Sequence, residues 1–314
     1  MKVFIAGGAG FIGSHVVDHV LGASEAAVTV FDNFTSGQRW HLGHHAGDAR
    51  LTVVAGDLQD RTAVADALAG HDIVYHFASN PDIAKAMTQP DIDFWQGTYL
   101  TQNLLEAMRA TGVRRFVYAS GSGVYGETGL KPVHEDWAPL LPISTYGASK
   151  LACEALIGAY CHMFGFRAWA FRFANVIGPR QTHGVAYDFI KKLRRDPSQL
   201  EILGDGSQSK SYIHVSDIVA AIQHVIGRAA AAFNYYNVAT EDHLDVRTIA
   251  EMVAAELGLR DVAFRFTGGD RGWKGDVPVL RFDLTKIHAL GWCARLGSGD
   301  AMRRAIREML EERS

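Results

Sequence analysis

The chain has 314 residues, 48% of them hydrophobic, and a formal net charge of −3. This length and apolar content allow a large buried core, arranged as one bilobal unit or as two lobes. The net negative charge gives the chain no overall positive potential that would attract nucleic acid. No apolar run approaches the roughly 18 uninterrupted residues of a membrane span.

A glycine-rich turn follows the first predicted strand. The short apolar run Val3–Ala6 is typical of a buried parallel strand, and an amphipathic helix is predicted shortly after it. Between them stand three glycines at three-residue spacing, Gly7, Gly10 and Gly13. Glycine lets a pyrophosphate approach the backbone closely, and the start of the helix, at Phe11 and Ile12, offers N–H groups to the phosphates. The pattern predicts a dinucleotide site.

The second predicted strand, Ala27–Phe31, ends in an acid. Asp32 stands about 20 residues after the glycine turn, where a carboxylate accepts hydrogen bonds from ribose hydroxyls, which favours NAD over NADP. Asn33 follows it, and a third strand, Leu51–Ala55, leads to Asp57 and Leu58. Asp57 is a candidate for contact with the adenine. An alternative role for Asp57 is that of an acid at the start of the helix Asp60–Ala69.

Two further strands complete the first half. Asp72–Ser79 is predicted to bring Phe77, Ala78 and Ser79 under the cofactor, at the carboxyl edge where open parallel sheets bind ligands. A helix over Asp91 to Thr111 follows, with core residues predicted at Leu100, Leu104, Leu105 and Met108. The fifth strand, Arg115–Ser120, delivers Ser120 to the same edge, and a sixth strand is predicted later in the chain, over Arg167–Asn175.

A tyrosine and a lysine stand four residues apart at the start of the next predicted helix. Tyr146 and Lys150 therefore share one helix face, about a turn apart. An ammonium group there can stabilise a phenolate, so Tyr146 is the predicted general base and Lys150 its partner.

These motifs resemble the extended short-chain dehydrogenase/reductases, and within them the NAD-dependent nucleotide-sugar enzymes of the UDP-glucose 4-epimerase type. The resemblance covers nearly the whole chain and includes the glycine turn, Asp32, Val124-Tyr125-Gly126, the Tyr146/Lys150 pair, 172–179 and 212–217. It implies a doubly wound parallel α/β sheet, bound NAD and a UDP-hexose or similar nucleotide-diphosphate sugar as substrate. It further implies epimerisation through a transient 4-keto sugar, and a homodimer formed through a four-helix bundle.

One position departs from the family pattern. Where the family carries a Ser or Thr that assists the tyrosine, this chain has Gly121, and Ser122 is predicted to supply the hydroxyl if a local turn swings it into place. Otherwise Tyr146 acts without it. The window 121–123 holds no acid of the kind that family dehydratases and decarboxylases carry, which favours epimerisation. The alternatives are a UDP-glucuronate epimerase or decarboxylase, a dehydratase, a 4-keto reductase, or a catalytically weak sugar-nucleotide-binding homologue.

The resemblance also implies substrate contacts in the later part of the chain. They are predicted at Asn175, His183, Val185, Lys210, Tyr212, Arg271 and Asp276. Lys210 stands where relatives carry an arginine, and Trp273 occupies another arginine position, so Arg271 or Lys274 is expected to replace it, unless this stretch is an unspecialised surface loop. Leu280 favours a plain hexose or a uronate over an N-acetylated sugar, and Arg281 either pairs with a uronate carboxylate or is exposed to solvent.

The expected domains are a NAD-binding domain, 1–174 with about 213–240, and a smaller sugar-nucleotide lobe, 175–212 and 241–314. His41, His44 and His45 fall in a loop with no carboxylate or cysteine at ligand spacing, so no metal site is predicted. Cys153, Cys161 and Cys293 lack CxxC spacing, which indicates a reducing compartment. With a strand rather than a signal peptide at the N-terminus, the expected location is the cytoplasm.

Overall fold

The computed structural model describes residues 1–80 and 83–312, and its backbone divides into two compact units that interleave along the chain. Unit 1 contains Met1–Gly121, Thr145–Arg172 and Ile222–Tyr236. Unit 2 contains Ser122–Ser144, Phe173–Ala221 and the chain from Asn237 onward. The segment 122–144 thus belongs to unit 2, whereas the sequence analysis assigned it to the NAD-binding domain. The binding role of each unit stays a prediction.

Unit 1 is built on a seven-stranded parallel sheet, which confirms the doubly wound α/β fold. The strand order is β12-β7-β5-β4-β1-β2-β3. From β1 the chain builds outward through β2 and β3, and then returns to place β4 on the other side of β1, so the order reverses between β1 and β4. Ligands of such sheets bind at this reversal, beyond the carboxyl ends of the strands. The strands are β1 (Lys2–Ala6), β2 (Ala27–Asp32), β3 (Leu51–Ala55), β4 (Ile73–His76), β5 (Arg115–Gly121), β7 (Arg167–Phe173) and β12 (Phe233–Val238).

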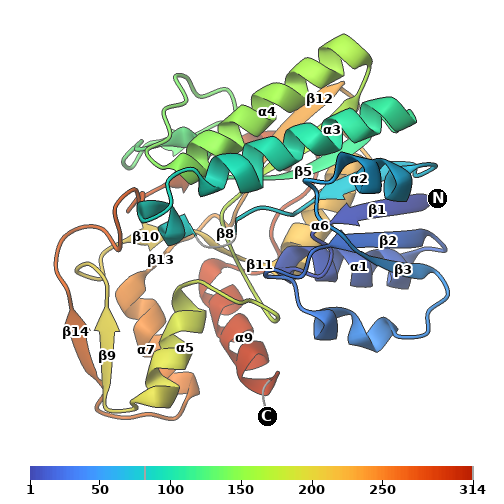
Figure 1. Cartoon of the computed structure of the whole chain (residues 1–314). Coiled ribbons are helices and arrows are strands. Elements are labelled where there is room, and N and C mark those ends of the chain that lie inside the picture. The colour runs from blue at the N-terminus through green and yellow to red at the C-terminus, as the bar shows by residue number, and fades with distance from the viewer. Residues whose placement is uncertain (81–82, 313–314) are drawn as a thin grey trace. The chain divides into compact units, whose positions relative to one another are not determined.

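Helices cover both faces of this sheet. Figure 1 shows α2, α3 and α4 on one side and α1 on the other. Leu104, Leu105 and Met108 are fully buried against the sheet side chains, as their helical spacing predicted. The helical elements of unit 1 are α1 (Phe11–Ala23), η1 (Arg39–His45), α2 (Arg61–Leu68), η2 (Ile83–Met87), η3 (Phe94–Tyr99), α3 (Leu100–Thr111) and α4 (Thr145–Phe164).

Two predicted strand ends are wrong. β4 ends at His76, three residues before the predicted end at Ser79, because the N–H groups of Phe77 and Ala78 both turn to the Ala6 carbonyl, at 2.9 and 3.2 Å. The helix predicted over Asp91 to Thr111 is present: it begins at Ile92, contains the π-helical segment η3 and continues as α3 to Thr111. The strand predicted over 167–175 is split at Ala174, whose N–H donates to the Val238 carbonyl.

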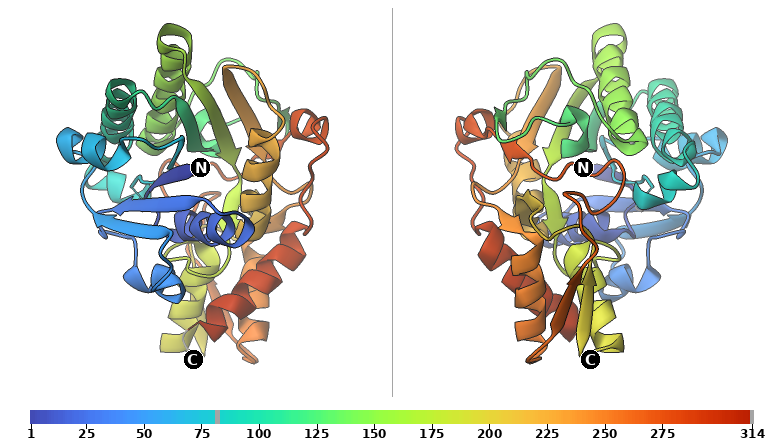
Figure 2. Two further views of the ribbon diagram at one scale, coloured as in Figure 1. Left: turned by 90° about the vertical axis from the view of Figure 1, so that its right-hand side faces the viewer. Right: turned by 90° about the vertical axis from the view of Figure 1, so that its left-hand side faces the viewer.

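Unit 2 packs three helices around a second apolar core. Figure 2 shows α5, α7 and α9 side by side, and their buried residues include Phe189, Ile249 and Met302. The helical elements are η4 (Ser122–Tyr125), α5 (Val185–Arg195), α7 (Val246–Glu256), α8 (Thr285–His288) and α9 (Ser298–Glu311), and α6 (Val215–Ile226) has residues in both units. Short strands pair as β6 (Pro132–Val133) with β15 (Arg281–Phe282), β8 (Asn175–Ile177) with β11 (Tyr212–His214), β9 (Gln199–Ile202) with β14 (Ala263–Phe266), and β10 (Ser209–Lys210) with β13 (Leu244–Asp245).

Within residues 1–80 and 83–312, no helix combines the length and the apolar character that a membrane span requires.

Candidate active site

The glycine turn lies between β1 and α1, at the reversal of the strand order. Gly7 has a φ of +77°, and a Cβ there would lie 2.5 Å from the backbone nitrogen of Ala78. A Cβ on Gly13 would lie 2.2 Å from the Gly7 carbonyl oxygen. These two glycines let β1, α1 and the end of β4 approach one another. Gly10 is the N-cap of α1 and provides no side-chain acceptor, so the N–H groups of the first turn, at Phe11 and Ile12, get no cap from it.

Asp32 is the last residue of β2, and its carboxylate braces the glycine turn. One oxygen accepts the Ala9 N–H at 2.9 Å and the other accepts the Phe34 N–H at 2.8 Å. A carboxylate offers about four acceptor positions, so these two bonds leave capacity for ribose hydroxyls. Asp32 is 8% exposed, and the two hydrogen bonds hold its carboxylate in one orientation.

The predicted adenine residues lie beside Asp32. Asn33 donates its side-chain amide to Asp57 at 3.0 Å, and the other oxygen of Asp57 accepts the Gln59 N–H. Leu58 is buried, and its carbonyl accepts the Asn103 amide. The helix that follows is capped by Asp60, which accepts from Thr62 and Ala63. The structure therefore gives the capping role, which the sequence analysis considered for Asp57, to Asp60.

Tyr146 and Lys150 lie in the first turns of α4. The Lys150 ammonium is 5.4 Å from the centroid of the Tyr146 ring, and it donates to the Ala119 carbonyl on β5 at 2.9 Å. Lys150 is only 5% exposed, so a fixed positive charge lies beside the tyrosine. This is the juxtaposition that their four-residue spacing predicted.

The start of α4 is held by residues that the sequence analysis did not single out. Asp93 is buried, and its carboxylate accepts the Thr145 hydroxyl at 2.7 Å and the Asn80 amide at 2.9 Å. Its carbonyl accepts the Ser149 hydroxyl at 2.7 Å. Gly97 in η3 makes room for this packing, because a Cβ there would lie 2.3 Å from the Ser149 hydroxyl oxygen. The sequence pattern does not mark Asp93, because its partners are distant in the sequence: Thr145 and Ser149 are more than 50 residues away, and Asn80 is 13 residues away.

Ser120, predicted as a cofactor residue, bonds to the inner side of α4. Its hydroxyl donates to Glu154 at 2.5 Å, and Glu154 forms a buried ion pair with Arg172 at 2.7 Å. Ser120 therefore helps to attach the end of β5 to α4, and only its remaining acceptor capacity is open to another partner.

His76, the last residue of β4, is a neutral buried histidine. Its Nε2 lies 3.1 Å from the Thr101 hydroxyl. Burial, with a smaller contribution from the charge of Lys150, lowers the pKa of His76 to about 3. Phe77, Ala78 and Ser79 follow the end of β4, and the backbone of Ala78 lies against Gly7 of the glycine turn.

In unit 2, Ser122 begins the 3-10 helix η4 directly after β5. The turn that the sequence analysis required at this position is therefore present. A Cβ built on Gly121 would meet no atom within 4 Å. The absence of a side chain at this position is thus not imposed by packing.

The predicted phosphate-binding cations of unit 2 are both paired with carboxylates. Lys210 donates to Asp276 at 2.5 Å, and Arg271 forms an ion pair with Glu127. Arg271 also donates to the Asp276 carbonyl at 3.1 Å. Asp276 thus joins Lys210 and Arg271, and an incoming phosphate would have to share these cations with the two carboxylates.

The remaining predicted substrate residues lie on several elements of unit 2. Asn175 begins β8 and donates to the Ser211 carbonyl at 3.3 Å, and His183 contacts Thr182 shortly before Val185 starts α5. Tyr212 is only 5% exposed, within the apolar core. Arg281 is not a free surface cation, because it donates to the carbonyl and the hydroxyl of Ser209 at 2.9 and 3.1 Å.

Comparisons with known proteins identify the family to which the chain belongs. The sequence profile described as "NAD dependent epimerase/dehydratase family" matches residues 3–239, so the chain belongs to that family. A UDP-glucose 4-epimerase of Mycolicibacterium smegmatis is 30% identical, over 98% of this chain and 97% of the relative.

Two solved structures share the fold over the whole chain. A UDP-galactose 4-epimerase is 38% identical with a TM-score of 0.88, covering 100% of both chains. A dTDP-glucose 4,6-dehydratase of Streptomyces venezuelae, solved with NAD bound, is 28% identical with a TM-score of 0.91, covering 100% of this chain and 98% of the other. The protein is a NAD-dependent nucleotide-sugar epimerase/dehydratase.

Its cofactor is NAD, and unit 1 has the features that this molecule requires. Gly7 and Gly13 have no side chains that would keep a pyrophosphate from the backbone, and the start of α1 presents N–H groups to it. The buried carboxylate of Asp32 lies at the end of β2.

Proposed function

We propose that the protein is a nucleotide-sugar 4-epimerase that interconverts UDP-glucose and UDP-galactose through a transient 4-keto sugar. The observation that carries the proposal is the buried ammonium of Lys150, 5.4 Å from the Tyr146 ring centroid and bonded to the Ala119 carbonyl. An enzyme of this kind needs a base for the sugar 4-hydroxyl, and a phenolate stabilised by a fixed cation is suited to that task.

In this proposal Tyr146 takes the proton of the 4-hydroxyl and returns it after the sugar has presented its other face. Lys150 stabilises the phenolate form, and the Ser122 hydroxyl assists by a hydrogen bond to the sugar. NAD, when bound, supplies the hydride acceptor and donor for C4. Because the same cofactor molecule serves both half-reactions, no net NADH accumulates.

The cofactor and substrate contacts are proposed at the residues that the sequence analysis predicted. The cofactor set is Gly7, Gly10, Phe11, Ile12, Asp32, Asn33, Asp57, Leu58, Phe77, Ala78, Ser79, Ser120, Tyr146 and Lys150. The substrate set is Ser122, Tyr146, Asn175, His183, Val185, Lys210, Tyr212, Arg271 and Asp276. Tyr212 is buried, so its contribution is the support of neighbouring residues rather than a direct hydrogen bond from its ring.

We prefer epimerisation to dehydration because of the three residues at the end of β5 and directly after it. Elimination from C5 and C6 of the sugar needs an acid near the tyrosine, and the residues Gly121, Ser122 and Gly123 supply none. The similarity to a dTDP-glucose 4,6-dehydratase makes dehydration the second candidate, since that relative has a TM-score of 0.91 to this chain. We also propose a cytoplasmic homodimer.

The test is incubation of the purified protein with UDP-glucose in deuterated water, without added NAD, followed by proton NMR. UDP-galactose without deuterium at C4 is the expected product, because a hydride held on the cofactor does not exchange with solvent. Deuterium at C5 or C6 with loss of water would establish a dehydratase. Failure to convert UDP-glucose, UDP-glucuronate or dTDP-glucose would contradict any catalytic role for the Tyr146/Lys150 pair.

Tyr146→Phe is the decisive variant in the same assay. Removing a general base costs about 10²- to 10⁴-fold in rate. Tyr160→Phe is the matched control, because Tyr160 lies on the same helix 14 residues later, about 21 Å along its axis. Its hydroxyl contacts Gln102 and Glu106, and so it is expected to keep the wild-type rate.

A further inference from the structure

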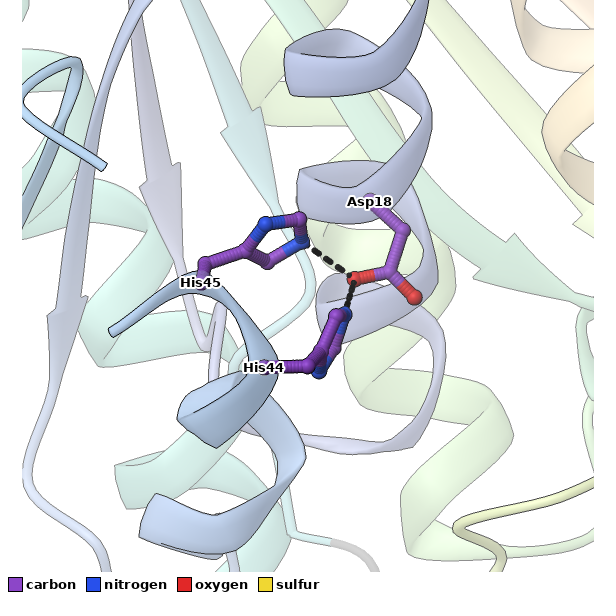
Figure 3. Close-up of side chains that lie close together, drawn as sticks. All are labelled: Asp18, His44 and His45. Atoms are coloured by element: carbon purple, nitrogen blue, oxygen red, sulfur yellow. Dashed lines mark hydrogen bonds and ion pairs between the residues drawn. The ribbon is translucent and has the colours of Figure 1, made fainter. Parts of the chain in front are cut away.

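We propose that Asp18, His44 and His45 form a binding site for a divalent transition-metal ion of the zinc class. Figure 3 shows the two imidazole rings turned toward one carboxylate oxygen. Nε2 of His44 lies 2.8 Å from Asp18 Oδ1, and Nε2 of His45 lies 2.9 Å from the same atom. The sequence analysis excluded a metal here because it found no carboxylate at ligand spacing, but α1 supplies one from 26 residues away.

The orientation of the two histidines is unusual for adjacent residues. In a 3-10 helix, neighbouring side chains diverge by about 120° around the axis. Here both rings come from the end of η1, yet their centroids are 4.1 Å apart and their Nε2 atoms converge. One cation bound between the two rings would be shared by both imidazoles and the carboxylate.

The donor atoms are spaced closely enough to hold one ion. All three lie within 4.8 Å of one another. Donors at about 2.1 Å from a tetrahedral ion are about 3.4 Å apart, so binding requires the present 2.8 and 2.9 Å contacts to open by about half an ångström. Side-chain rotation can provide this, because His44 and Asp18 are 47% and 28% exposed. The same exposure leaves the fourth position to water.

The ligand types select the metal. Two imidazoles and a carboxylate suit Zn²⁺, Co²⁺ or Ni²⁺, whereas Mg²⁺ and Ca²⁺ prefer sets made entirely of oxygen. An ion at this place would join η1 to α1. Between Asp32 and His45 the chain already contacts the glycine turn, since Gln38 N–H and His41 Nδ1 lie 2.9 and 2.7 Å from the Ala9 carbonyl. The bound ion would therefore fasten the segment that lies against this turn.

The test uses the full chain without a polyhistidine tag, titrated with Zn²⁺ by calorimetry and with Co²⁺ by visible absorption. One equivalent of each metal is expected to bind, with Co²⁺ bands typical of a nitrogen and oxygen environment. Zn²⁺ is also expected to raise the melting temperature by about 2 °C or more. His44→Gln, His45→Gln and Asp18→Asn are each expected to weaken Zn²⁺ binding at least about tenfold.

Two control variants separate this site from other metal ligands. His162→Gln removes an exposed histidine on α4, and Cys293→Ser removes an exposed thiol, so both are expected to bind Zn²⁺ as the wild type does. Melting temperatures in EDTA identify any variant that has lost its fold. His44 is the most exposed of the three ligands, so His44→Gln is the substitution least expected to disturb the fold. Absence of stoichiometric binding, or binding that all three ligand substitutions leave unchanged, would overturn the proposal.

Discussion

The hydroxyl that is proposed to assist Tyr146 can be located by substitution at two adjacent residues. We expect Ser122→Ala to lower kcat for UDP-glucose by about 2- to 12-fold, the value of one neutral hydrogen bond. A Cβ at Gly121 meets no atom within 4 Å, so this position, where the family resemblance implies Ser or Thr, can accept such a side chain without a steric clash. Gly121→Ser in the Ser122→Ala background is therefore expected to restore the lost rate.

The control for this experiment is Gly121→Ala in the same background, which adds a Cβ but no hydroxyl. Steady-state kinetics of all four proteins decide the outcome. If Ser122→Ala keeps the wild-type kcat, Ser122 does not assist, and Tyr146 acts without this hydroxyl.

His76 makes the stability of the protein sensitive to acid. Its pKa is lowered to about 3 in the folded state, mainly by burial. The unfolded imidazole, with a pKa of about 6.5, binds a proton at pH 5.5 that the folded state does not bind. The stabilising contribution of the neutral ring is thus complete above about pH 6.5 and declines as the pH falls toward 3. Between pH 7.5 and 5.5, the expected loss from this residue is about 1.4 kcal/mol.

Urea unfolding of His76→Gln at the two pH values tests this expectation. The variant loses the bond to Thr101 and is less stable at pH 7.5, but its free energy of unfolding is expected to fall less on acidification, by about 1.4 kcal/mol. His162→Gln, at an exposed position, is expected to keep the wild-type pH dependence. Equal pH dependence in His76→Gln and the wild type would show that His76 is not the residue responsible.

At the scale of elements, a buried ion pair joins three parts of unit 1. Glu154 on α4 accepts Ser120 from β5 and binds Arg172 on β7, and the side chains of the pair are only 5% and 4% exposed. Both Lys150 and this glutamate lie on α4, one turn apart. The pair therefore fixes α4 to the strand end that precedes Gly121.

Removal of one partner is expected to be costly. Glu154→Ala leaves the Arg172 guanidinium buried without its carboxylate, and we expect it to lower the free energy of unfolding by about 3–5 kcal/mol. Replacement of both residues by methionine is expected to recover part of this loss. Asp300→Ala is the control, because it breaks an exposed pair with Arg303 and is expected to cost less than about 1 kcal/mol. A similar loss from Glu154→Ala and Asp300→Ala, measured by urea unfolding, would contradict this assignment.

At the scale of the whole molecule, α4 leaves apolar side chains uncovered. Met163 and Phe164 at its end are 67% and 37% exposed. A second copy of the chain would cover such a face, in agreement with the homodimer that the family resemblance implies. Ala159, exposed on the same helix, is the site for the test.

Light scattering after size exclusion is expected to give twice the chain mass for the wild type and a monomer for Ala159→Arg. The added cation would lose its hydration in an apolar interface without gaining a partner. Ala255→Arg, on an exposed position of α7 in unit 2, is expected to remain dimeric. A monomeric wild type, or a dimeric Ala159→Arg, would exclude this interface.

The sequence by itself determined the fold class, the alternation of strands and helices in the first half, and the cofactor. These features depend on local signals: apolar runs, three glycines, an acid at a strand end, and a tyrosine and lysine one helical turn apart. Local signals can be recognised without knowledge of tertiary contacts, because they reflect steric and hydrogen-bonding requirements of residues that are close in the sequence. The strands β2, β3 and β5 were accordingly predicted to within one residue.

The tertiary structure alone decided how side chains distant in the sequence combine. Asp93 holds the start of α4, Glu154 binds Ser120 and Arg172, and the cations Lys210 and Arg271 are paired with Asp276 and Glu127. Asp18 likewise reaches His44 and His45 only because α1 and η1 pack together. Such pairs leave no periodic trace in the sequence, because partners separated by tens of residues are brought together by the packing of whole elements.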